Sequence, residues 1–261
     1  MQRSCRCVGL SRAAYYQPPT RNDRDAEVVD AINATIDKHP RWGFWKTFKT
    51  LRRQHRWNHK RVHRIYCKLG LNQQRRAKKR LPKRLKQPLL VPPLPNQVWS
   101  ADFMSDTLYA GKRFRTFNVI DDFNRESVHI EIDTSITAKR LIRVFERIRL
   151  DRGLPEVLRT DNGPEFTSSE FVAWAEAAGM MIQYIQPGEP NQNAYIERFN
   201  RSYRNELLDL YMFRNLSEVR EATYWWMVDY NEQRPHDSLG DLTPAEYMSK
   251  NGQNSILQLS T

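Results

Sequence analysis

Three acidic residues stand where their side chains could do chemistry together: Asp102, Asp161 and Glu197. Asp102 lies in the middle of a predicted strand, Asp161 directly follows another predicted strand, and Glu197 lies inside a predicted helix. If the two strands are neighbours, the two aspartates share one crevice, and Glu197 can reach it from the flanking helix. Three converging carboxylates raise one another's pKa unless a cation is held between them. Because oxygen-only ligands select Mg²⁺ or Mn²⁺, we expect a pair of such ions, which suits phosphodiester chemistry.

The elements that must position these residues are predicted beyond residue 95. Three strands with alternating apolar residues and short turns predict an antiparallel meander. Apolar residues at Leu141, Val144, Phe145 and Ile148 then recur at helical intervals. The order of elements predicts an α/β fold, with a mixed five-stranded sheet and helices on its faces. Strands are predicted over 97–104, 114–121, 128–132, 157–160 and 181–185, and helices around 141–148, 171–178, 191–210 and 216–231.

Charge divides the chain into two halves. Residues 1–95 carry 24 Lys and Arg against 5 Asp and Glu, net +19, whereas residues 96–261 carry 18 against 25, net −7. No acidic residue occurs between Asp37 and Asp102, a stretch that holds 19 Lys and Arg. So many like charges favour a polyanionic partner over a solvated tail, and nucleic acid is the interpretation we prefer.

Three helices are predicted in the basic half, over 23–39, 42–54 and 59–69. A short turn joins the last two, and Gly70 closes the third. A basic helix pair with a tight turn predicts a helix-turn-helix-like DNA-binding unit, although the same pair is also a common packing motif.

Two other groups of residues resemble metal sites. Asp121 and Asp122 close the second strand, but a strand-end turn accounts for them equally well, and we leave both out of the catalytic set. One basic helix and the turn before it carry side chains at intervals of four: His55, His59, His63 and Cys67. Because this spacing lacks a zinc-finger partner pair, we prefer a basic helix surface to a zinc site.

The chain therefore divides into four segments. The second is basic and then Pro-rich, and is expected to be extended and to carry no core. In the last segment Trp225 and Trp226 are expected to be core residues. The segments are a basic helical, helix-turn-helix-like region (1–71), a linker (72–95), a catalytic core (96–210) and a C-terminal helical extension (211–261).

Five stretches carry a resemblance to a known family: VWSADF (98–103), FNVIDDFNRE (117–126), RTDNGPEF (159–166), IQPGEPNQNAYIERFNRSYRNELLD (185–209) and YNEQRPHDSLGDLTPAEY (230–247). Residues 96–248 resemble the retroviral-integrase-like core of DDE transposases, specifically the second-frame product (OrfB) of the insertion-sequence-three family. Asp161 and Glu197 are separated by 35 residues, the spacing that names this catalytic group. Upstream, HPRWGFWKTFKTLRR and NHKRVHRIYCKLGL resemble the helix-turn-helix segment of those proteins.

The resemblance implies an RNase H-like fold in which Asp102, Asp161 and Glu197 bind two Mg²⁺ ions, which Mn²⁺ can replace. It implies a DNA transposase that frees a 3′-OH at the element's end and then uses this hydroxyl to attack a phosphodiester, without a covalent enzyme intermediate. Implied partners are the element's terminal inverted repeats, target DNA, further copies of the chain on DNA, and a first-frame product or frameshift fusion.

Polar and basic residues in three regions are candidates for DNA contact. They are Asn193, Arg201 and Arg204 around Glu197; Arg52, Arg53, Lys60, Arg61 and Arg64 in the helix-turn-helix-like region; and Arg75, Arg76, Lys78, Lys79 and Arg80 in the linker.

Two other functions stay open from the residues alone: a catalytically silent DNA-binding protein, and an RNase H-like nuclease that cleaves without joining. No apolar run has the length of a signal peptide or a membrane span, and three cysteines without a CxxC motif suit a reducing compartment. We therefore expect a cytoplasmic, nucleoid-associated protein without a membrane partner.

Overall fold

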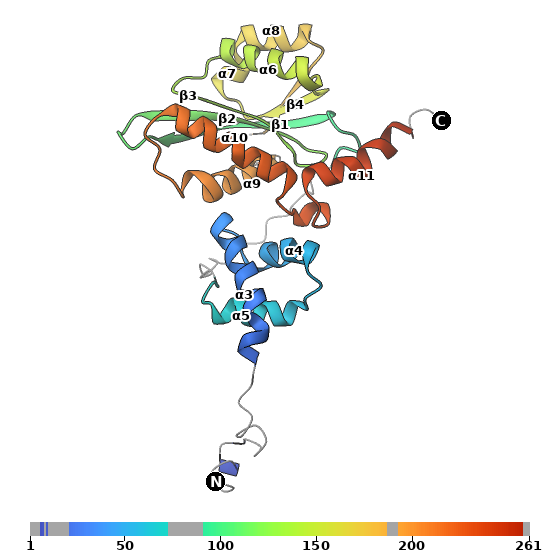
Figure 1. Ribbon diagram of the computed structural model, residues 1–261. Helices are drawn as coiled ribbons and strands as arrows, with labels where there is room; N and C mark the ends of the chain where they lie inside the picture. Colours follow the sequence, from blue (N-terminus) through green and yellow to red (C-terminus); the bar gives the residue numbers. More distant parts are fainter. Residues whose placement is uncertain (1–5, 8, 10–20, 73–90, 187–192, 258–261) are drawn as a thin grey trace. The chain divides into compact units, whose positions relative to one another are not determined.

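The computed structural model describes residues 6–7, 9, 21–72, 91–186 and 193–257 (Figure 1). The chain forms two compact units, residues 1–78 and 79–261. The boundary between the units lies within the segment predicted to be a linker. No helix in the described part of the chain combines the length and the apolar character that crossing a membrane requires.

The described part of the first unit from residue 21 onwards contains three helices: α3 (Arg21–Lys38), α4 (Phe44–Gln54) and α5 (His59–Lys68). The helices pack around one small core, and the Asn58 side chain caps α5 by accepting the Lys60 N–H at 2.9 Å. Gly70 follows α5 with a φ of 70°, a conformation that favours glycine. The core residues are Val28, Ile32, Phe48, Leu51, Val62, Ile65 and Tyr66. All three helices were predicted, and their ends differ by at most two residues.

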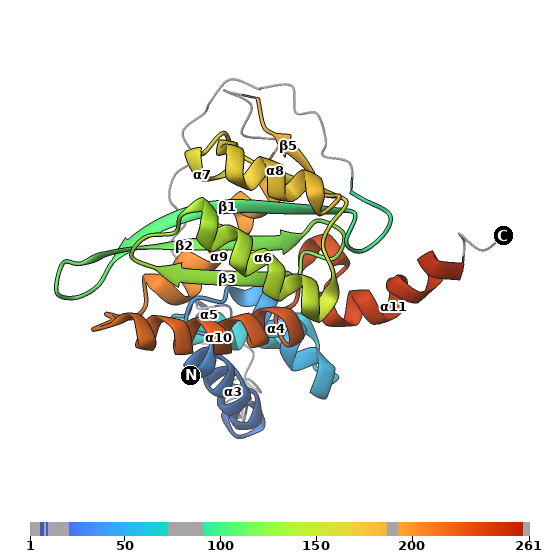
Figure 2. The same ribbon diagram turned by 90° about the horizontal axis from the view of Figure 1, so that it is seen from above.

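A five-stranded sheet forms the centre of the second unit, with strands in the order β3-β2-β1-β4-β5 (Figure 2). The first three strands form an antiparallel meander, and β1 pairs with β4, and β4 with β5, in parallel. The predicted mixed sheet is confirmed, and the first and fourth strands are neighbours, the condition under which Asp102 and Asp161 share one crevice. The strands are β1 (Val98–Thr107), β2 (Arg113–Asp121), β3 (Ser127–Asp133), β4 (Val157–Thr160) and β5 (Met181–Tyr184).

Helices cover both faces of this sheet (Figure 1). On one face α6 (Ala138–Arg152), α7 (Pro164–Thr167) and α8 (Ser169–Ala177) enclose a core that includes Trp99, Phe117, Phe145 and Phe166. On the other face lie α9 (Ala194–Tyr203), the π-helical turn η2 (Arg204–Leu208) and α10 (Leu216–Glu232). They pack Ile196, Phe199 and Tyr203 against β-strand residues such as Ile120 and Ile132. Because apolar side chains project from both faces of the central strands, the sheet separates two hydrophobic cores.

Beyond residue 190, the structure differs from the prediction in three respects. Trp226 is 8% exposed and belongs to the second core, but Trp225 is 62% exposed, so only one residue of the aromatic pair is a core residue. The short helix η3 (Asp237–Leu239) and α11 (Pro244–Leu257) were not predicted. The helix predicted over 191–210 is divided into α9 and η2.

Candidate active site

The register of β1 and β4 sets Asp102 beside Asp161. The parallel ladder runs from Val98 opposite Val157 to Ser100 opposite Arg159. Two residues further along each strand stand Asp102 and Asp161, on the same face of the sheet because side chains alternate between faces. This is the face covered by α9, since Asp102 accepts a hydrogen bond from that helix.

Glu197 lies in the first turn of α9 and is exposed to solvent. Three residues further along the helix, Asn200 donates from Nδ2 to Asp102 Oδ2 at 2.7 Å. Residues three apart in a helix share a face, so Glu197 lies on the side of α9 that contacts Asp102. The structure thus brings the three predicted carboxylates to one region of the sheet, and the charges of Asp161 and Glu197 both act on Asp102.

The electrostatics of Asp102 reflect this surplus of negative charge. Burial is the largest cause of a raised pKa at the Asp102 carboxyl, and the charges of Asp161 and Glu197 add to it. Hydrogen bonds from the Phe103 N–H and Asn200 oppose the rise, and the net pKa is about 6. Asp102 therefore sits in a field that a bound cation would relieve.

Two buried asparagines hold Asp102 in place. Asn118 on β2 lies opposite Asp102 in the antiparallel ladder, and its Nδ2 donates to Asn200 Oδ1 at 2.7 Å. This bond turns the Asn200 amide so that its NH₂ group faces Asp102. Asn118 is 0% exposed and Asn200 is 8% exposed. Asn200 was not among the site residues predicted from the sequence. Its spacing of three residues from Glu197 was the available signal.

The turn after β4 fixes Asp161. Asp161 Oδ1 accepts the Gly163 N–H at 3.0 Å, which closes a small turn before α7. A Cβ atom at position 163 would lie 3.0 Å from that same oxygen and 3.4 Å from Glu165 Oε2. A side chain at position 163 would press on the carboxylate of Asp161, which favours glycine here.

Asp121 and Asp122, which we left out of the catalytic set, are both engaged in hydrogen bonds within the fold. Asp121 accepts the N–H groups of Asn96 and Phe123, each at 2.9 Å. Asp122 is 0% exposed and accepts hydrogen bonds from Ser100 and Arg159, each at 2.7 Å. Burial nevertheless raises the pKa of Asp122 to about 6.

A buried arginine in the turn between β2 and β3 anchors the start of α9. Arg125 has a φ of 61° and donates a hydrogen bond to the Asp122 carbonyl oxygen. Its guanidinium lies 3.4 Å from the centroid of the Tyr195 ring, two residues before Glu197. The contact ties the first turn of α9, and with it Glu197, to the sheet.

The described residues contain no group of three or more His, Cys, Asp or Glu side chains gathered as a metal cage. Among the side chains resembling a zinc face, the Cys67 sulfur lies 3.7 Å from His63 Nε2. His55 stacks on Trp57 with ring centroids 3.9 Å apart, and His59 lies beside Trp45 and Phe48.

The predicted DNA-contact residues around Glu197 occupy three environments. Arg201 is exposed. Arg204 donates to Asp106 Oδ2 at 3.1 Å and to the Ser105 carbonyl at 2.9 Å, which holds it against β1. Asn193 is only 4% exposed, and its Oδ1 has no hydrogen-bond partner among the described residues. A DNA contact through Asn193 is therefore disfavoured by its burial.

The candidates in the first unit also differ from one another. Arg52, Arg53 and Lys60 are exposed. Arg61 and Arg64 both hold Asp25 of α3, at 3.1 Å and 2.7 Å, and so join α5 to α3. The linker candidates lie outside the described residues: Arg75, Arg76, Lys78, Lys79 and Arg80.

The sheet order, the two aspartates at adjoining strands and the glutamate on the covering helix define an RNase H-like, integrase-type core. Models of the integrase core domain match residues 92–190 and 178–244, and a model of an HTH-like domain matches residues 23–80. The chain belongs to the insertion-sequence-three family of transposases, whose proteins carry out DNA transposition.

The chain is similar to several known proteins. A 31.7 kDa protein of insertion element IS407 from Burkholderia multivorans is 39% identical over 95% of this chain and 90% of its own length. A putative transposase of insertion sequence element IS986/IS6110 from Mycobacterium tuberculosis is 27% identical over 91% of this chain and 94% of its own length. Among solved structures, the HTLV-2 integrase catalytic core domain in complex with magnesium aligns with 19% identity and a TM-score of 0.45, over 59% of this chain and 97% of that chain.

Proposed function

We propose that Asp102, Asp161 and Glu197 are the catalytic residues of a magnesium-dependent polynucleotidyl transferase that cleaves the ends of an insertion sequence and joins them to target DNA. The observation that carries the proposal is the position of Asp102. Asp102 is half-buried in β1 and stands level with Asp161, which follows the parallel strand β4. The negative charges of Asp161 and Glu197 both disfavour the ionised form of Asp102.

The donor set fits divalent metal ions. All three side chains offer carboxylate oxygens, the ligands that Mg²⁺ prefers and that Mn²⁺ accepts. Burial is the main cause of the raised pKa of Asp102, and the negative charges of Asp161 and Glu197 add to it, so a bound cation would lower this pKa. Two Mg²⁺ ions bound there would activate the attacking oxygen and stabilise the leaving oxygen.

The chain's own residues orient this chemistry. Asn200, held by Asn118, fixes the carboxylate of Asp102, and the Gly163 turn fixes that of Asp161. In the first step a water oxygen attacks a phosphorus at the element's end, and the 3′ oxygen leaves as a hydroxyl. In the second step that 3′-OH attacks a phosphodiester, a new P–O bond forms, and the displaced strand leaves with the proton.

DNA is the substrate in both steps, so the proposed partners are the terminal inverted repeats and the target duplex. Two ends must be held together during joining, which favours several copies of the chain on the DNA. A first-frame product or a frameshift fusion would be a further partner. Binding to chromosomal DNA would place the protein at the nucleoid.

A strand-transfer assay with a labelled terminal-repeat duplex and Mg²⁺ tests the proposal. We expect joined products that depend on the metal. Cleavage without joining would instead identify a nuclease, and a salt-sensitive gel shift without any reaction would identify a DNA-binding protein only.

A further inference from the structure

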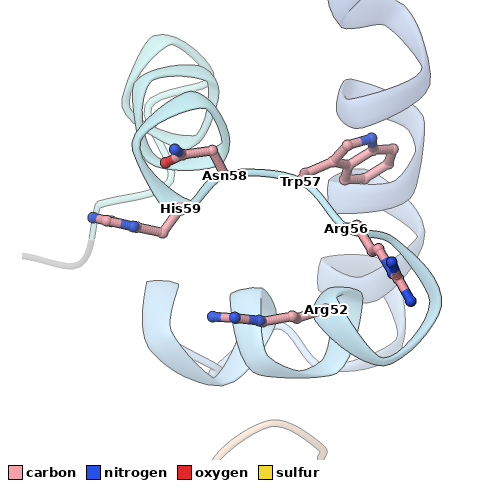
Figure 3. Close-up of a pocket in the computed structure, with 5 residues that line it drawn as sticks. All are labelled: Arg52, Arg56, Trp57, Asn58 and His59. Carbon is pink, nitrogen blue, oxygen red and sulfur yellow. The ribbon is translucent and has the colours of Figure 1, made fainter.

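An open pocket lies in the first unit where α4 passes into α5 (Figure 3). It has a volume of about 560 Å³, within the range of pockets that hold small ligands. Arg52 on α4 lies across the opening from Asn58 and His59, which begin α5, and Arg56 and Trp57 lie on the connection between the helices (Figure 3).

The walls of this pocket are held in place before any ligand binds. Trp57 packs against the core of the first unit and stacks on His55 with ring planes 4° apart. His59 lies beside Trp45 and Phe48, with ring centroids 6.3 Å and 6.2 Å away. Asn58 also caps α5, so the turn that carries the basic side chains is held both by packing and by a hydrogen bond.

Positive charge at the pocket is not balanced by the fold. Within the described residues, neither Arg52 nor Arg56 forms an ion pair with an acidic side chain, and the first turn of α5 contains no acidic residue. The nearby Asp25 is engaged with Arg61 and Arg64. The pocket therefore presents guanidinium groups, and the N-terminal end of a ten-residue helix, to solvent.

We propose that this pocket lies against the DNA backbone, with Arg52 and Arg56 each the ligand of one phosphate group. The inference rests on the proposed function, because it assigns one part of the DNA contact. Guanidinium groups match phosphate oxygens in pairs, and the side-chain NH₂ of Asn58 is a further donor. The exposed Lys60 on α5 continues the basic surface beyond the pocket, which suits a polymer of phosphates better than a single free ion.

The same geometry divides the arginines of the first unit by role. Arg61 and Arg64 of α5 donate hydrogen bonds to the carboxylate of Asp25 and so join α5 to α3. Arg52 on α4 and Arg56 on the connection to α5 form no ion pair with an acidic side chain of the described residues and are available for a ligand. Arg56 was not among the residues predicted from the sequence to contact DNA.

Salt dependence of binding measures phosphate contacts directly. We compare the full-length chain with the double variant Arg52→Ala, Arg56→Ala on two duplexes of equal length, one carrying the terminal repeat and one of random sequence. Affinity falls as salt rises, and the loss of two phosphate contacts makes the slope of log affinity against log salt less steep by about 1.8. Between about 50 and 200 mM salt, the fall in affinity therefore becomes about tenfold smaller than for the wild type, on both duplexes alike.

Two further variants serve as controls. Lys139→Ala, Arg143→Ala removes the same charge from the exposed face of α6, and we expect it to leave the slope unchanged. Arg52→Lys, Arg56→Lys keeps the charge and is expected to keep most of the slope. The thermal unfolding of each variant is measured alongside, to show that the first unit is folded.

Three outcomes overturn the pocket assignment: an unchanged slope in the folded double variant, a loss confined to the terminal-repeat duplex, or competition by millimolar inorganic phosphate as strong as that by DNA. A loss confined to the repeat would mean that the arginines read bases. These outcomes are independent of the strand-transfer assay. If the wild type fails to join DNA while the slope still falls, the proposed chemistry fails and the pocket stands.

Discussion

At the scale of single residues, the site depends on how Asp102 is held. Its two oxygens accept one hydrogen bond each, from the Phe103 N–H and from Asn200. Asn200 is itself oriented by Asn118, whose Oδ1 has no partner among the described residues. The chain from Asn118 through Asn200 to Asp102 thus sets the carboxylate's direction, because a buried amide with one fixed contact cannot rotate freely.

Asn200→Leu should slow strand transfer by about 10- to 100-fold, the usual range for residues that orient metal ligands. Leucine fills a similar volume but leaves Asp102 Oδ2 without its donor. DNA binding measured by gel shift should be unchanged. The Mg²⁺ concentration for half-maximal rate should rise, a change that a purely structural defect would not produce.

Asn205→Leu is the matched control, since Asn205 is an exposed asparagine in the turn that follows α9. It should retain the wild-type rate and magnesium dependence. Equal losses in the two variants would show that the effect comes from the helix surface and not from the contact with Asp102.

The sequence could predict on which elements the three candidate carboxylates lie but not which side chains hold them. Asp102, Asp161 and Glu197 are placed by strand and helix periodicity, which is local information. The contact between Asn118 and Asn200 depends on the register of β1 with β2 and on the rotation of α9, which only the folded sheet sets. The burial of Asn193 has the same origin.

At the scale of elements, an acidic residue on β3 secures α6 to the sheet. Glu131 is 7% exposed and contacts His129, Arg140 and Arg147 at 3.1, 2.6 and 2.8 Å. Burial by itself would raise the pKa of Glu131, but hydrogen bonds and charges from His129 and Arg140 outweigh it and lower this pKa to about 2. The ionised carboxylate therefore stabilises the contact between β3 and α6.

Glu131→Gln should lower the free energy of unfolding by about 2 kcal/mol at neutral pH, because a charge-assisted hydrogen bond is lost. The folded-state pKa is depressed, so the stabilisation by Glu131 is complete above the unfolded value of 4.5 and is lost as pH falls towards about 2. The difference between wild type and variant should therefore shrink below about pH 4.5 in urea unfolding series run from about pH 7 to 3.

Glu170→Gln, which changes an exposed glutamate on α8, provides the reference and should have little effect at any of these pH values. A Glu131→Gln effect that stays constant down to the lowest pH would argue against the ion-pair explanation.

Element prediction succeeded where apolar residues repeat regularly and was wrong where they do not. Leu141, Val144, Phe145 and Ile148 are all buried on α6, as their spacing predicts. The segment of α11 has few apolar residues at helical intervals, and it was not predicted as a helix. The pocket between α4 and α5 was also out of reach, because the geometry of the connection between the helices decides which side chains line it.

At the scale of the whole molecule, charge and chemistry are divided between the two units. Residues 1–95 carry net +19 and contain the helix-turn-helix-like region, while the acidic site lies in the part with net −7. A protein built in this way can bring DNA to a site whose own carboxylates repel it, provided that cations mediate the contact. Binding and catalysis should then be separable by mutation.

Asp161→Asn should abolish joining while end binding stays within about twofold of the wild type, because one oxygen ligand is lost but the basic unit is intact. Gel shifts and strand transfer on the same terminal-repeat duplex check both halves of this expectation. Loss of binding together with joining would show that DNA affinity also resides at the acidic site.

The most direct test of the three-carboxylate site is anomalous diffraction from crystals of the protein with terminal-repeat DNA and Mn²⁺. We expect two manganese peaks about 3.5 to 4 Å apart, ligated by Asp102, Asp161 and Glu197 and lying against the DNA strand end. Peaks at other side chains, or a Glu197 carboxylate turned away from ions held by the two aspartates, would contradict the assignment of these residues as the catalytic set.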